Sequence, residues 1–97
     1  MEQVPCINIL VGDDHKVIFQ GVEAMLSRNG QLGRLDYAGS IDDIKCQLTE
    51  GNYDLLILDL NLAGVNSLNY VSDFRTLSSQ LKIIIFSSIN RGFKIPL

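Results

Sequence analysis

Three aspartates of this chain follow aliphatic segments at the points where buried strands would end. Asp13 and Asp14 come directly after the run at residues 6–12, and Asp59 follows the run LLIL. An ionised carboxylate beside a buried strand is costly unless a partner compensates its charge. Grouped carboxylates also repel one another, and a hard divalent cation removes that repulsion. The pattern therefore predicts a metal site, with Mg²⁺ as the natural cation for such oxygen ligands.

Asp59 is also a candidate nucleophile. A carboxylate oxygen that attacks a phosphoryl donor forms an aspartyl phosphate, and a metal ion neutralises charge on the transferring group. Ser87 lies at the end of a later aliphatic run, KIIIFS, and its hydroxyl can donate a hydrogen bond to a phosphoryl oxygen. The residue types thus indicate phosphoryl transfer to Asp59, provided that the fold brings these residues together.

Alternating strands and helices are expected to bring Asp13, Asp14, Asp59 and Ser87 together. Aliphatic runs predict strands at residues 6–12, 35–38, 54–60 and 82–87, and apolar residues at helical spacing predict helices between them, at 16–29, 41–50 and 67–77. Ser40 is the expected N-cap of the second helix, with Asp43 three residues later. The residues expected to face the sheet are Ile18, Val22, Met25 and Leu26 in the first helix and Leu68, Val71 and Phe74 in the third.

The order β-α-β-α-β-α-β predicts an α/β fold with a parallel sheet and helices on both faces. Ligands of such sheets bind beyond the carboxyl ends of the strands, near the point where the strand order reverses. With strand order 2-1-3-4, the first and third strands are neighbours. Asp13, Asp14 and Asp59 then meet in one pocket.

The composition excludes several function classes. The 8 Lys and Arg against 11 Asp and Glu give a net charge of -3, and the basic residues are scattered, so no nucleic-acid binding by this chain alone is expected. No aliphatic run approaches the roughly 20 residues that cross a bilayer. The N-terminal residues lack the layout of a signal peptide. We therefore expect a cytoplasmic protein with no membrane contact.

These motifs resemble the receiver domain of two-component response regulators, in particular the NarL/FixJ-like group, whose receivers usually precede a helix-turn-helix DNA-binding domain. The resemblance rests on ILVGDDH, LLILDLNLAGVNSL and IIIFSS and covers roughly residues 8–88. It implies a flavodoxin-like (CheY-like) doubly wound sheet, and a histidine kinase or phosphotransfer protein as partner. It implies Mg²⁺ binding by Asp13, Asp14, Asp59 and the backbone carbonyl of Asn61, with Asp59 as phosphoacceptor and Ser87 as the switch hydroxyl.

The sequence departs from the family pattern near its C-terminal end. After Ser88 the segment INRGFKIPL is too short for a helix, a strand and a second helix, so strand five and helices four and five are expected to be missing or replaced. No residue matches the family's lysine by position, and Lys94 in GFK resembles its setting only superficially. Residues 1–97 are expected to form a single receiver domain, incomplete at this end and without a DNA-binding effector domain.

Three functions remain open. The leading one is a phosphoacceptor switch rather than a turnover enzyme. The second is a pseudo-receiver that is not phosphorylated and acts as an interaction module, because an unpaired apolar strand at residues 82–87 favours a homodimer through that strand or through element exchange. The third is an aspartate-nucleophile phosphohydrolase of the haloacid-dehalogenase type, whose pattern places a second aspartate where this chain has Asn61.

Simpler roles also fit the individual residues. Asp13 and Asp14 can cap the following helix and interact with its positive end. Asp59 can accept hydrogen bonds from loop amides. His15 follows the two acids and is predicted to be an exposed residue of the loop or first helical turn, without a functional role.

Overall fold

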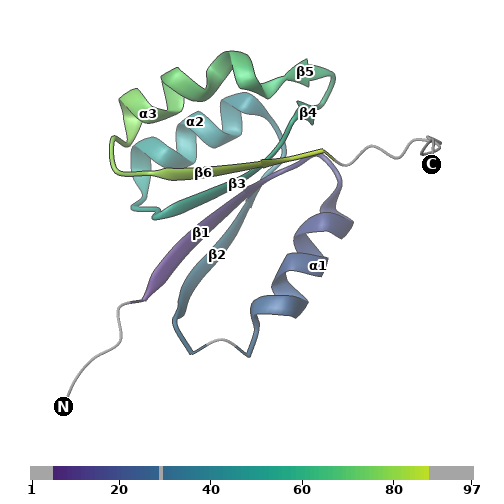
Figure 1. Ribbon diagram of the computed structural model, residues 1–97, viewed down its shortest axis with the longest axis vertical. Coiled ribbons are helices and arrows are strands. Elements are labelled where there is room, and N and C mark those ends of the chain that lie inside the picture. The colour runs from purple at the N-terminus through teal and green to yellow at the C-terminus, as the bar shows by residue number, and fades with distance from the viewer. Residues whose placement is uncertain (1–5, 29, 88–97) are drawn as a thin grey trace.

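The protein forms a four-stranded parallel sheet in the order β2-β1-β3-β6 (Figure 1). This computed structural model describes residues 6–28 and 30–87. The strands are β1 (Ile7–Gly12), β2 (Leu32–Ala38), β3 (Leu55–Asp59) and β6 (Lys82–Phe86). The order matches the predicted 2-1-3-4, because β6 is the fourth long strand in the sequence. The flavodoxin-like (CheY-like) fold class is therefore confirmed.

Helices cover both faces of the sheet, with α2 (Ile41–Glu50) and α3 (Val71–Leu77) on one face and α1 (Lys16–Leu26) on the other (Figure 1). The Ser40 hydroxyl accepts a 3.1 Å hydrogen bond from the amide of Asp43, as the cap pattern predicted. The segment predicted as one third helix starts instead with a 3₁₀ turn, η1 (Ser67–Tyr70). Within the described part of the chain, no helix combines the length and apolar character needed to cross a membrane.

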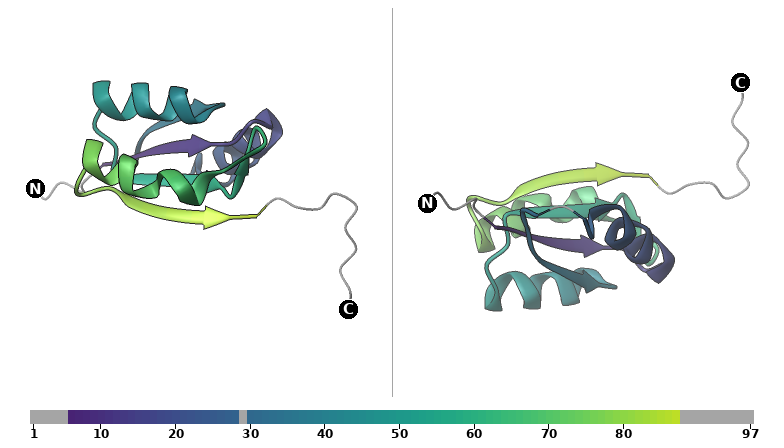
Figure 2. Two further views of the ribbon diagram at one scale, coloured as in Figure 1. Left: turned by 90° about the horizontal axis from the view of Figure 1, so that it is seen from above. Right: turned by 90° about the horizontal axis from the view of Figure 1, so that it is seen from below.

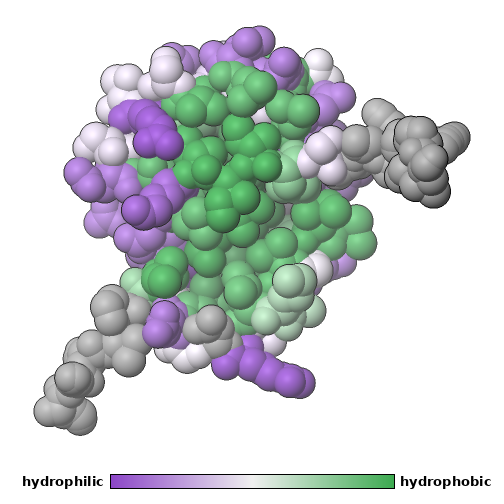
Figure 3. Space-filling view, viewed as in Figure 1, coloured by the Kyte–Doolittle hydropathy of each residue, from purple (hydrophilic) through white to green (hydrophobic). Residues whose placement is uncertain are grey.

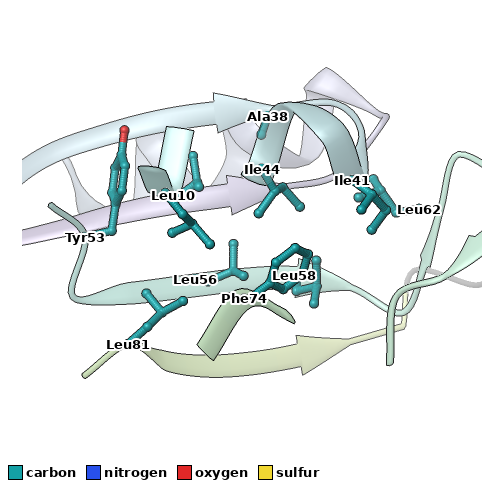
Figure 4. Close-up of a cluster of buried hydrophobic side chains, with 11 residues drawn as sticks. Leu10, Ala38, Ile41, Ile44, Tyr53, Leu56, Leu58, Leu62, Phe74 and Leu81 are labelled. Carbon is teal, nitrogen blue, oxygen red and sulfur yellow. The ribbon is translucent and has the colours of Figure 1, made fainter. Parts of the chain in front are cut away.

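The main core lies between the sheet and the pair α2 and α3 (Figure 4). Leu10, Leu56 and Leu58 point from the sheet toward Ile44 and Phe74, and all five side chains are fully buried. Each such burial stabilises the fold by about 1.5–3 kcal/mol. Gly12 lets α2 approach β1 closely, because a Cβ atom there would lie 2.7 Å from Ile44 Cδ1. This packing holds the end of β1 in place.

Two residues that were predicted to face the sheet are exposed instead, Met25 in α1 and Leu68 in η1, so these two predictions are wrong. Met25 is 78% exposed and Leu68 is 52% exposed. The half-buried side chains of α1 include Phe19, which makes an edge-to-face contact with Tyr37 at 5.5 Å between ring centroids. The buried side of α1 is thus turned toward Phe19 and away from Met25. Leu68 belongs to η1, whose three residues per turn break the α-helical phase of the pattern.

Strand β6 is the edge of the described sheet, and Figure 2 shows it as the outermost strand in both views. Its residues Ile84 and Ile85 are 53% and 36% exposed. Figure 3 shows apolar side chains gathered across the middle of this side of the molecule. The predicted apolar edge is therefore present in the described part of the protein.

Candidate functional site

An acidic pocket lies at the carboxyl ends of β1 and β3. Gly12 pairs with Leu58 in the sheet register, so the next residues, Asp13 and Asp59, follow at the same edge. Both aspartates are buried, with 0% and 1% of their surface exposed, whereas Asp14 and His15 are exposed. One potential ligand atom from each of these four residues lies within 4.8 Å of the others. The structure thus brings the three predicted aspartates together and adds His15.

The hydrogen bonds of Asp13 leave one of its oxygens without a partner. Asp13 Oδ1 accepts a 2.8 Å hydrogen bond from the backbone amide of His15, and the Asp13 amide donates to the Ala38 carbonyl at 3.0 Å. Asp13 Oδ2 is buried and has no hydrogen-bond partner. A buried carboxylate oxygen of this kind is costly, and a cation beside it would remove the cost. The donor set therefore fits a divalent metal ion.

The electrostatics of the pocket agree with this geometry. Burial raises the pKa of Asp13 above its ordinary value of 3.8, and the nearby charge of Asp59 raises it further, while hydrogen bonds from His15 act in the opposite direction. Burial also raises the pKa of Tyr37, and the charges of Asp13 and Asp14 add to that effect. Without a cation, the pocket therefore disfavours the charged form of Asp13.

This penalty predicts that Asp13→Asn stabilises the metal-free protein at neutral pH. The pKa of Asp13 is raised in the folded state, so ionisation of Asp13 destabilises the folded protein. The full cost applies when the pH is above the folded-state pKa, and almost none applies when the pH is below the unfolded-state pKa. We expect a gain on the order of 1 kcal/mol in the free energy of unfolding at pH 7, because Asn removes the buried charge and its repulsion with Asp59, although its amide is still a buried polar group. Urea denaturation of the wild type and the variant in EDTA, at pH 7 and near pH 3, measures this gain.

The gain should shrink at the acidic pH, where the carboxyl is neutral in both states. Asp14→Asn is the matched control, because the Asp14 side chain is 32% exposed and its charge is better solvated. An Asp13→Asn protein that is less stable than the wild type at pH 7 would contradict the argument.

The segment between the strand predicted at residues 54–60 and the helix predicted at residues 67–77 has regular structure. It forms a short antiparallel hairpin from β4 (Asn61–Leu62) and β5 (Val65–Asn66). Ala63 and Gly64 at its tip have φ angles of 50° and 82°. A proline, whose ring holds φ near about −65°, could not replace Ala63 in this conformation. The conformation of the hairpin tip therefore excludes proline at position 63.

Ser67 anchors the same segment to the sheet. Its hydroxyl is buried and donates a 2.6 Å hydrogen bond to the carbonyl of Asp59. The carbonyl of Leu60, at 3.1 Å, is a second acceptor for the same hydroxyl. The Asn61 amide donates to Asp59 Oδ1 at 3.3 Å. Sequence reasoning found no role for Ser67, because a serine at the start of a helix is common and gives no signal of a long-range contact.

Of the remaining predicted site residues, Ser87 and Asn61 lie near the pocket. Ser87 follows Phe86, which pairs with Asp59 in the register of β3 and β6, so Ser87 continues toward the same edge and is exposed. Asn61 lies at the start of β4, directly beyond the pocket. Lys94 lies outside the described residues.

Comparisons with known proteins give a consistent result. The family model described as the response regulator receiver domain matches residues 9–94. The nitrate/nitrite response regulator protein NarL of Escherichia coli is 31% identical over 93 residues, covering 84% of this chain and 38% of NarL. The Fimbriae Z protein of Escherichia coli is 24% identical over 90 residues, covering 89% of this chain and 41% of that protein. This chain spans about two fifths of the length of these relatives.

A solved structure shows the same architecture. The response regulator protein TrrA from Thermotoga maritima, in complex with Mg(2+)-BeF, superposes with a TM-score of 0.73 and is 29% identical. The match covers 86% of this chain and 70% of that chain.

Proposed function

This chain belongs to the family of response regulator receiver domains, and from that membership we propose that it is a phosphoacceptor module of a two-component phosphorelay. In this proposal Asp59 accepts a phosphoryl group from a histidine kinase or phosphotransfer protein in a reaction that requires Mg²⁺. The observation that carries the proposal is the buried pair Asp13 and Asp59 with the unpartnered Asp13 Oδ2 beside it. The presence of Mg(2+)-BeF in the TrrA structure supports the choice of cation.

Each pocket residue has a separate task in this proposal. Asp13, Asp14, Asp59 and the Asn61 carbonyl would hold Mg²⁺, which when bound neutralises charge on the phosphoryl oxygens. A carboxylate oxygen of Asp59 attacks the phosphorus, and the bond from phosphorus to the donor breaks as the acyl phosphate forms. Ser67 fixes the backbone carbonyl of Asp59, so that the attacking side chain keeps its position. The Ser87 hydroxyl is the proposed donor to a phosphoryl oxygen.

A small-molecule phosphodonor tests this function without the cognate kinase. We expect the purified chain, incubated with acetyl phosphate or phosphoramidate and Mg²⁺, to gain the mass of one phosphoryl group in intact-mass spectrometry. EDTA should abolish the gain, because the pocket then keeps its repulsion and the transferring group is not neutralised. Sustained release of phosphate from small esters would instead indicate the phosphohydrolase. The absence of any adduct in a folded chain would contradict the proposal.

A second candidate function, self-association as an interaction module, is favoured by the exposed apolar residues of the edge strand β6. Edge strands present unpaired backbone groups to other chains, and a lysine on such a strand opposes pairing. Because Ile84 is 53% exposed, we expect Ile84→Lys to weaken a homodimer by at least about tenfold in Kd, which is about 1.4 kcal/mol. Sedimentation velocity over a wide concentration range measures this change.

Val17→Lys is the matched control for that experiment. Val17 is 66% exposed but lies on α1, away from the strand edge. An equal effect of both substitutions would indicate non-specific association. A compact wild-type monomer at all concentrations would exclude the dimer through β6.

A further inference from the structure

The side chain of His15 lies against the two aspartates that follow β1. Its Nδ1 atom is 3.3 Å from Asp13 Oδ1 and 3.3 Å from Asp14 Oδ1. His15 is the N-cap residue of α1 but makes no side-chain cap hydrogen bond there. Its side chain is 62% exposed, so it lies on the solvent side of the acidic group, whereas Asp13 and Asp59 are buried.

Both 3.3 Å contacts lie within the range of a hydrogen bond or ion pair, and they also equal the separation expected between two ligands of one metal ion. Two atoms that each lie about 2.1 Å from a metal ion, at the angles of octahedral or tetrahedral coordination, are about 3.0–3.4 Å apart. The buried Asp13 Oδ2, which has no hydrogen-bond partner, is a second and independent sign of an ion in this pocket.

We propose that His15 is a nitrogen ligand through which this pocket binds a transition-metal cation such as Zn²⁺ or Co²⁺, in addition to Mg²⁺. Mg²⁺ takes oxygen ligands, whereas imidazole suits Zn²⁺ and the later first-row cations, whose affinity for mixed nitrogen and oxygen sites is higher. Asp13, Asp14 and Asp59 supply the oxygen ligands, and each can place one within 4.8 Å of the imidazole nitrogen. The inference rests on the acidic pocket of the proposed function but not on phosphorylation itself.

A direct test is possible because the chain contains one histidine. The imidazole ¹⁵N resonances then belong to His15 alone, and they are followed by NMR at about pH 7.5 during titration with Zn²⁺ and, separately, with Mg²⁺. Both cysteines are exposed and can bind Zn²⁺, so the titrations use a Cys6→Ser/Cys46→Ser chain alongside the wild type. We expect Zn²⁺ to produce the large shift of one nitrogen that direct coordination causes, and Mg²⁺ to produce none.

Calorimetric titration of His15→Gln adds a quantitative measure. We expect the ratio of Zn²⁺ affinity to Mg²⁺ affinity to fall at least tenfold relative to the wild type, in a chain that keeps its circular dichroism spectrum. If His15 is only a counter-ion of the aspartates, His15→Gln will instead bind both cations equally well or more tightly, and this outcome overturns the inference. A Zn²⁺ shift of the His15 nitrogen that appears in Asp13→Asn at the same Zn²⁺ concentrations as in the wild type shows that the ion binds His15 without the acidic pocket, and this outcome also overturns the inference.

The phosphodonor experiment separates this inference from the proposed function. A wild-type chain that is not phosphorylated with Mg²⁺ but shows zinc coordination at His15 would remove the function and leave the inference in place. A wild-type chain that is phosphorylated with Mg²⁺ but shows no zinc coordination at His15 would support the proposed function and overturn the inference.

Discussion

Asp59→Asn is expected to abolish phosphorylation of this chain while the chain stays folded. An amide oxygen is a poor nucleophile and cannot replace the attacking carboxylate, so the loss should be complete rather than partial. The Asn side chain has nearly the same shape and can still accept the 3.3 Å hydrogen bond from the Asn61 amide. Removing the charge also removes its repulsion with Asp13, so we expect no loss in the free energy of unfolding.

Intact-mass spectrometry with acetyl phosphate and Mg²⁺ measures this effect, and urea denaturation checks the fold. Asp73→Asn is the matched control, because Asp73 lies on α3, its side chain is 53% exposed and it pairs with Lys45 at 3.5 Å, away from the pocket. The control should gain phosphate like the wild type. A phosphate-sized gain that persists in Asp59→Asn would show that another residue is the acceptor.

Phe74→Ala is expected to cause the largest loss of stability among the single substitutions considered. Phe74 is fully buried on α3, and its ring points into the core beside Leu56 and Leu58 (Figure 4). Truncating a buried phenylalanine leaves a cavity and costs about 3–5 kcal/mol. Small domains have a total stability of about 5–15 kcal/mol, so this substitution removes a large share of it or unfolds the chain.

Leu77→Ala is the control on the same helix. Leu77 is 40% exposed, so its truncation should cost about 1 kcal/mol or less. Urea denaturation of both variants, monitored by circular dichroism, measures the difference. Similar losses for the two variants would contradict the assignment of Phe74 to the main core.

Much of the fold could be predicted because its determinants are local. The aliphatic runs set the strands, the apolar spacing set the helices, and Ser40 with Asp43 set the start of α2. Alternation of strands and helices requires parallel pairing with crossovers, which restricts the topology to few solutions. Asp13 and Asp59 follow paired positions at one sheet edge, so their proximity follows from the predicted strand order.

Contacts between elements could not be predicted in the same way. The apolar pattern of α1 defines a broad stripe but not the rotation of the helix on the sheet, and the contact of Phe19 with Tyr37 leaves Met25 in solvent. Leu68 is exposed because the 3₁₀ turn changes the angle between successive side chains. The hydrogen bond from Ser67 to the Asp59 carbonyl joins two separate segments and has no local signature.

The sequence alone therefore determined the kind of site, namely carboxylates at the ends of neighbouring strands with Asp59 as the candidate phosphoacceptor. Only the tertiary structure decided that Asp13 Oδ2 is buried without a hydrogen bond and that His15 lies within 3.3 Å of two carboxylates. The physical reason is the difference between local interactions along the chain and contacts between distant segments. Local patterns fix which residues end a strand, whereas burial and distances between side chains depend on how separate elements pack together.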